Sequence, residues 1–181
     1  MDTATLTVTY YTSGELPEIE AQLLAVYAEV YQQEAETDPF FSVDRFTERL
    51  HSHASAPRWG CALGDINGQP VGYAYGFART GAYEWNGLLT PVEPDLLVES
   101  DTRTFALCEV MVRQPWRAKG IAHTLHEELL SHRIEERSHL LVEQDHPKVR
   151  AVYERWGYQW MGEMQPYLDA PRYDSLIRPL V

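Results

Sequence analysis

A strand, a basic turn and a helix follow one another without a break over residues 105–130. The run "FALCEVMVR" is apolar enough to predict a strand. "QPWRAKG" interrupts it with a proline and a glycine, and "IAHTLHEELL" begins a predicted helix that extends to about Arg137. A strand that turns into a helix is typical of sheets with helices on their faces, so the sequence predicts an α/β (α+β) fold.

The remaining segments extend this pattern along the chain. The dipeptide Asn67-Gly68 lies between two apolar runs and predicts a β-hairpin. Other strands are expected at residues 3–11, 139–145, 158–164 and 173–181, and other helices at residues 18–33, 42–53 and 147–157. The order predicts a mixed central sheet of about seven strands flanked by about four helices. We expect one domain over residues 1–181.

Charge and composition exclude several classes of partner. The formal net charge is −12, which argues against nucleic acid and anionic membranes, because phosphate binding needs a basic surface. No apolar run approaches the roughly 18 residues of a membrane span. The start of the chain lacks a signal-peptide pattern, and Cys61 and Cys108 lie in apolar runs typical of buried free thiols. We therefore expect a cytoplasmic protein.

The basic turn has the features of an anion site. Arg117 and Lys119 add positive charge, and Gly120 lets the backbone approach a ligand closely at a helix start. The pattern is neither the Walker P-loop nor the dinucleotide fingerprint, because only one glycine is present. An ordinary strand-to-helix turn with surface charges explains the turn equally well at this point.

Two motifs together resemble one family. Residues 117–122 resemble the acetyl-coenzyme A signature R/Q-x-x-G-x-G/A of the GNAT acyltransferase superfamily, and "AVYERWGY" resembles its second signature. The resemblance implies the GNAT fold and acetyl-CoA as co-substrate, with no metal. It also implies backbone contacts with the coenzyme from the following residues: Val110, Val112, Arg117, Ala118, Lys119, Gly120, Ile121 and Ala122. His146 stands near the place where family members often have a coenzyme-binding asparagine.

The resemblance and the residues indicate two catalytic groups. Tyr153 matches the family tyrosine that assists the departing thiolate. Glu109 is an acid within an apolar strand, and desolvation would raise its pKa toward that of a general base. A packed helical tyrosine and a structural carboxylate are the alternatives.

The acceptor site is expected to be aromatic and acidic. In the family, acceptor specificity comes from the first two helices and from the loop before the signature strand. The corresponding candidates here are Tyr31, Phe40, Tyr83 and Trp85. Glu143, at the end of the strand before the second-signature helix, is a further candidate to face the acceptor. Aromatic faces and carboxylates would suit a cationic amine, whereas the alternative is that the aromatic residues belong to the core.

The resemblance implies an N-acetyltransferase. The acetyl group would pass directly from acetyl-CoA to a primary amine in a ternary complex, and the acceptor would be a small molecule. Another acyl-CoA donor, a protein amine as acceptor, and a non-catalytic coenzyme-binding module stay open. A homodimer stays open as well.

Overall fold

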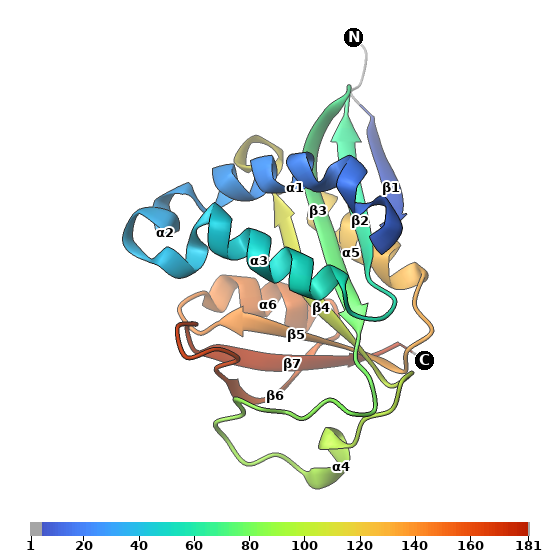
Figure 1. The fold of residues 1–181 in the computed structure, drawn as a ribbon, viewed down its shortest axis with the longest axis vertical. Helices are drawn as coiled ribbons and strands as arrows, with labels where there is room; N and C mark the ends of the chain where they lie inside the picture. The colour runs from blue at the N-terminus through green and yellow to red at the C-terminus, as the bar shows by residue number, and fades with distance from the viewer. Residues whose placement is uncertain (1–4, 181) are drawn as a thin grey trace. The chain divides into compact units, whose positions relative to one another are not determined.

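The computed structural model describes residues 5–180, which form a seven-stranded mixed sheet (Figure 1). Its strand order is β1-β2-β3-β4-β5-β7-β6. The strands are β1 (Leu6–Thr12), β2 (Gly60–Ile66), β3 (Gln69–Ala78), β4 (Thr104–Val112), β5 (Arg137–Glu143), β6 (Gln159–Met164) and β7 (Tyr173–Pro179). The helices are α1 (Leu16–Val30), α2 (Gln32–Thr37), α3 (Val43–Ala54), α4 (Pro94–Leu97), α5 (Ile121–Ser131) and α6 (Pro147–Arg155). Short 3-10 turns lie at η1 (Ser13–Glu15), η2 (Pro39–Phe41) and η3 (Gln114–Trp116).

The predicted mixed sheet is confirmed, and two helix boundaries differ from the prediction. Residues 3 and 4 of the first predicted strand and residue 181 of the last lie outside the described residues. The helix that follows the basic turn ends at Ser131, so its predicted extension to about Arg137 is wrong. The N–H groups of Glu136 and Arg137 donate to Thr102 and Arg103 instead, which places this segment in the sheet.

The helix content exceeds the predicted number because two short helices were missed. The helix predicted over residues 18–33 is interrupted at Tyr31, and α2 continues from there until Asp38, whose backbone is extended. Pro39 explains this end, because the residue before a proline avoids helical geometry. The other missed helix, α4, lies in the long proline-bearing segment between β3 and β4.

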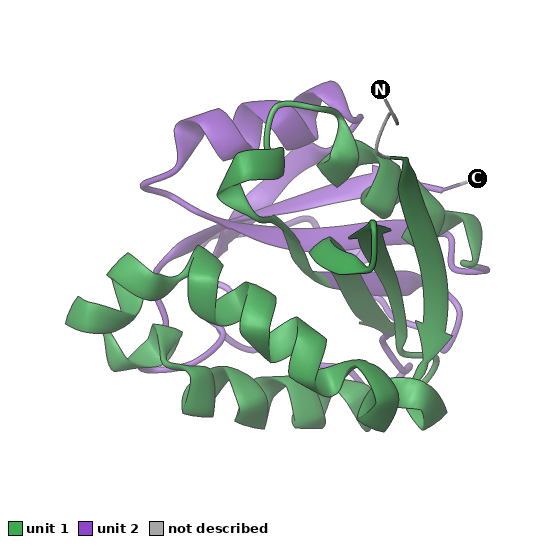
Figure 2. Ribbon diagram, turned by 90° about the horizontal axis from the view of Figure 1, so that it is seen from above, with its two compact units in different colours: residues 1–77, 108–133 green, residues 78–107, 134–181 purple. Residues whose placement is uncertain are grey.

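The chain divides into two compact units (Figure 2). Unit 1 consists of Met1–Phe77 and Cys108–Arg133, and unit 2 consists of Ala78–Leu107 and Ile134–Val181. The boundary falls within β4, which therefore contributes residues to both units. The single domain stays a prediction.

In unit 1, helices cover both faces of the β1-β2-β3 sheet. Residues of α1 and α3 form one core with alternate residues of β2 and β3, including Cys61, Leu63, Tyr73 and Tyr75. On the opposite face Leu125 of α5 approaches β2, and α5 packs against β1 and β2. Cys61 and Cys108 are free thiols, as predicted; Cys61 is buried and Cys108 half-buried.

Unit 2 is built on β5 and β7. β5 pairs in parallel with the start of β4 and antiparallel with β7, which in turn pairs with β6. Trp85, from the segment between β3 and β4, forms a small apolar cluster with Met161 and Met164 of β6. No helix among residues 5–180 has the length and hydropathy to span a membrane. The same residues contain no metal-binding group of three or more His, Cys, Asp or Glu side chains.

Gly72 allows a close backbone approach between β3 and β4 in unit 1. A Cβ at this position would clash with the Met111 carbonyl and lie 3.0 Å from the Val112 Cα. Both are backbone atoms, so a larger residue could be accommodated only by moving a strand.

The Gly72→Ala variant is expected to lower the free energy of unfolding by about 1–3 kcal/mol, the usual cost of overpacking. Urea denaturation measures this change. Gly14→Ala is the matched control, because a Cβ added at Gly14 would meet nothing within 4 Å, and it should change stability by less than about 0.5 kcal/mol. Equal stability of the two variants would contradict the close approach.

His139 is buried in unit 2 as a neutral imidazole. Arg79 donates to its Nδ1 at 3.3 Å, so the proton lies on Nε2, which donates to the Ser175 hydroxyl at 2.7 Å. Burial lowers the pKa of His139 well below its usual value, and the nearby charges of Arg79 and Arg137 lower it further.

This lowered pKa makes stability depend on pH. Below about pH 6.5 the unfolded chain binds a proton at His139 that the folded chain does not, so the stabilisation present above that pH is lost on acidification. The slope contributed is up to about 1.4 kcal/mol per pH unit. Urea titrations between about pH 7 and 5 give the free energy of unfolding as a function of pH. Its slope should be shallower in His139→Gln than in the wild type, and an identical slope would show that His139 does not cause the pH dependence.

Candidate active site

The basic turn connects the end of β4 to the start of α5 within unit 1. η3 follows β4, and Gly120 then begins α5 as its N-cap with φ +79°. Ala118 also has a positive φ of 59°. This conformation costs a non-glycine residue roughly 1–2 kcal/mol, and such conformations concentrate at ligand-binding segments.

The turn presents unpaired backbone donors. The N–H groups of Ala118, Lys119 and Gly120 donate to no acceptor in the described part of the chain. Ile121 and Ala122 occupy the first turn of α5, where N–H groups have no acceptor within the helix. A Cβ at Gly120 would meet nothing within 4 Å, so the space beside it is open. A run of such donors at a helix start binds anions.

The two cations of the turn are held near these donors. Arg117 Nε donates to the Val112 carbonyl at 2.9 Å, which orients its guanidinium at the end of β4. Lys119 Nζ lies 4.8 Å from the centre of the Trp116 ring. Val112 is buried and Val110 is half-buried. Main-chain contacts with the coenzyme are predicted for Val112, and its carbonyl already accepts the bond from Arg117.

Glu109 lies near two buried tyrosines in unit 1. It is half-buried, and its negative charge acts on Tyr73 and Tyr75 of β3. Burial raises the pKa of both tyrosines well above the usual value, and Glu109 raises it further. The Tyr75 hydroxyl contacts His53 Nδ1 at 3.2 Å, whereas the buried Tyr73 hydroxyl has no hydrogen-bond partner among residues 5–180.

Tyr31 and Phe40 belong to an aromatic cluster in unit 1 that also contains a cation missed in the sequence. Tyr31 stacks on Tyr27 and Phe41, with ring centres 4.7 and 5.3 Å apart. Phe40 is buried, and the Arg49 guanidinium carbon lies 4.2 Å from its ring centre. The sequence contained a signal for this cation, because Arg49 lies on the same buried face of α3 as Phe46 and Leu50. An apolar residue is expected at such a position.

The other predicted residues lie in unit 2. Tyr153 is half-buried on α6, with its ring edge-on to Trp156 and Tyr158. His146 is the exposed N-cap residue of α6, and its Nε2 lies 3.9 Å from a carboxylate oxygen of Glu143. Glu143, predicted for the acceptor site, and His146, predicted for the coenzyme, are thus neighbours between the end of β5 and the start of α6.

Tyr83 and Trp85 already contact a cation of the chain. The Arg79 guanidinium carbon lies 3.6 Å from the Tyr83 ring centre and 5.4 Å from that of Trp85. Trp85 is buried and packs edge-on against His139. Burial raises the pKa of Tyr83. Acceptor binding by these residues stays a prediction, as do the roles of the other predicted site residues.

Comparisons with solved structures bear on the fold of the chain. The Thermoplasma volcanium Ard1 structure aligns with a TM-score of 0.64 at 14% identity, covering 97% of this chain and 98% of that chain. An acyl-CoA N-acyltransferase from Pseudomonas aeruginosa aligns with a TM-score of 0.64 at 16% identity, covering 96% and 99%. A spermidine N-acetyltransferase chimera from Vibrio cholerae and hSSAT aligns with a TM-score of 0.59 at 15% identity, covering 97% of this chain and 95% of that chain. At these identities the likeness shows the fold.

The sequence itself decides the family. No curated protein matches the chain. Residues 21–158, however, match the acetyltransferase (GNAT) family, and this match includes both sequence motifs and covers most of the chain. The chain therefore belongs to the acetyltransferase (GNAT) family.

Proposed function

We propose that this protein transfers the acetyl group of acetyl-CoA to a primary amine of a small molecule, by direct attack in a ternary complex. The observation that carries the proposal is the turn at residues 117–122, whose backbone donors and flanking cations suit a pyrophosphate. We also propose a cytoplasmic location, which the two free thiols favour.

The residues of the turn fit the coenzyme. N–H groups from Ala118 to Ala122 would bind the pyrophosphate oxygens, and the open space beside Gly120 leaves room for them. Arg117 and Lys119 would add charge in a chain whose net charge is −12. Val110 would offer main-chain groups to the pantetheine arm, and His146 a side-chain contact. When bound, the coenzyme supplies the acetyl group as an activated thioester.

Two side chains would handle the protons of the reaction. The acceptor nitrogen bonds to the acetyl carbon as the carbon–sulfur bond breaks. Glu109 would accept the proton that the amine loses, and its place in an apolar strand favours this role. Tyr153 would donate a proton to the released sulfur.

The proposed acceptor is a small molecule bound near Tyr31 and Phe40 in unit 1, with Tyr83, Trp85 and Glu143 as the candidates in unit 2. The spermidine N-acetyltransferase among the similar structures acts on a small amine, which supports this class of acceptor. Two alternatives stay open, a protein amine as acceptor and another acyl-CoA as donor. Measuring transfer with a panel of acceptors and a panel of acyl-CoA donors tests both.

Replacing Gly120 tests the anion site. Gly120→Val is expected to weaken acetyl-CoA binding by about tenfold or more, because the side chain strains the backbone and hinders access to the N–H groups. Isothermal titration calorimetry measures the affinity. Gly68→Val is the matched control, since Gly68 also has φ +79° and a Cβ added there would meet nothing within 4 Å. If both variants bind acetyl-CoA like the wild type, the turn is not the pyrophosphate site.

Replacing Tyr153 and Glu109 tests the proton transfers. Tyr153→Phe and Glu109→Gln are each expected to lower kcat by about 100-fold while changing coenzyme affinity little. Thiol release with a panel of amines gives kcat, and calorimetry gives affinity. Wild-type kcat in either variant removes that residue from the mechanism. Tight coenzyme binding without release for any amine would favour a non-catalytic module.

A further inference from the structure

Arg49 of α3 is a buried cation in the aromatic cluster of unit 1. Only 6% of its surface is exposed. Its Nη1 donates to the Phe40 carbonyl at 2.8 Å and its Nη2 to the Tyr27 hydroxyl at 3.2 Å. The guanidinium also lies over the Phe40 ring. These contacts fix the orientation of the group, but all of them are with neutral partners.

The charge of Arg49 has no counter-ion within the described residues. Arg49 forms no ion pair there with an aspartate or glutamate, whereas buried Arg137 of unit 2 pairs with Glu99 at 3.0 Å. Burying an uncompensated charge is costly, and a guanidinium has more N–H donors than its two acceptors use. Arg49 therefore has both the charge and the spare donors to bind an anion.

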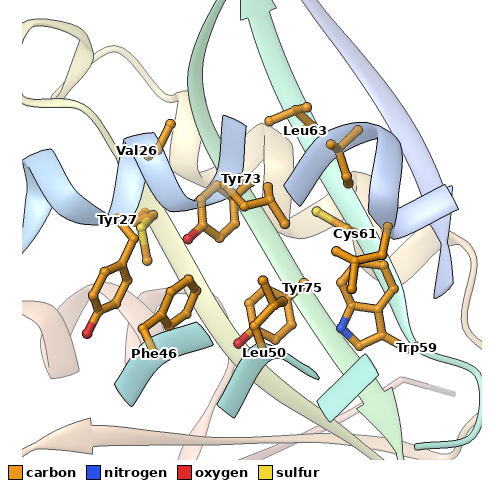
Figure 3. Packing of buried hydrophobic residues seen from close by; sticks show 13 residues of the cluster. Val26, Tyr27, Phe46, Leu50, Trp59, Cys61, Leu63, Tyr73 and Tyr75 are labelled. Carbon is orange, nitrogen blue, oxygen red and sulfur yellow. The ribbon is translucent and has the colours of Figure 1, made fainter. Parts of the chain in front are cut away.

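Arg49 and Glu109 both act on the same tyrosine. Tyr75 is within electrostatic reach of the two groups, and their charges shift its pKa in opposite directions. Figure 3 shows Tyr27, Phe46, Tyr73 and Tyr75 gathered between α1, α3 and β3. The face of Phe40 is already occupied by Arg49, so this ring is a poor site for a cationic end of an acceptor.

We propose that the acceptor carries a carboxylate as well as its amine, and that the Arg49 guanidinium binds the carboxylate while the amine lies at Glu109. The proposal rests on the proposed function and narrows the acceptor to the amino-acid class. A carboxylate supplies the missing counter-ion and matches the planar donor pattern of a guanidinium. Glu109 and Arg49 would then orient the two ends of one molecule.

Matched acceptors test this proposal. For a panel of amino acids and their carboxamides, kcat/KM for acetyl transfer is measured in the wild type, Arg49→Met and Arg49→Lys. The preference ratio of acid over amide should fall about tenfold or more in Arg49→Met and recover in part in Arg49→Lys. Comparing ratios between enzymes cancels the different reactivity of the two amines. Arg45→Met, on the same helix, should leave the ratio unchanged.

If Arg49→Met does not fold, inhibition of the wild-type enzyme still tests the proposal. Des-amino carboxylates of the preferred acceptors should inhibit it competitively, and the corresponding amides should not. Two results would overturn the carboxylate site while leaving the proposed function intact. One is acetyl transfer to amines without inhibition by these carboxylates. The other is an unchanged acid-over-amide preference ratio in a folded Arg49→Met. Absence of transfer to every amine would overturn both.

Discussion

The close contact between β3 and β4 at Gly72 fixes the end of β4, from which the basic turn begins. Because a glycine lets the backbones of these strands approach, Val112 ends β4 at a fixed place, and the Val112 carbonyl holds Arg117 at the beginning of the turn. Arg113, between them, is bonded through its N–H to Val71 and pairs with Glu29 of α1. Strand packing and the Arg117 bond thus fix the start of the turn that we propose as the anion site.

The same strand connects the proposed anion site to the core that contains Glu109's aromatic neighbours. Glu109 and Met111 lie two residues apart in β4, and Met111 belongs to the core that α1 and α3 cover. Glu109 is half-buried in this strand, and its charge acts on the buried Tyr73 and Tyr75. Donor binding and acceptor chemistry are therefore proposed for successive parts of one strand and its turn.

The turn and the order of the elements could be predicted from local patterns. Alternation, the Asn67-Gly68 hairpin and the glycine at the helix start are short-range signals, and each reflects the conformation of a few residues. The end of α5 could not be predicted in this way, because residues 132–137 have a helical composition and their place depends on pairing with β4. Competition between helix and sheet was decided by partners distant in the sequence.

The sequence by itself determined the sheet with its helices, the strand–turn–helix order around the basic turn and the family, since these depend on backbone conformation and local residue type. Only the tertiary structure brought Arg49 of α3 to Phe40 and Tyr27, and placed Arg79 over Tyr83. Of the aromatic residues predicted for a cationic acceptor, Phe40, Tyr83 and Trp85 thus already contact arginines of the chain. Burial makes this difference, because a buried guanidinium needs acceptors and ring faces around it, and here those come from residues distant in the sequence.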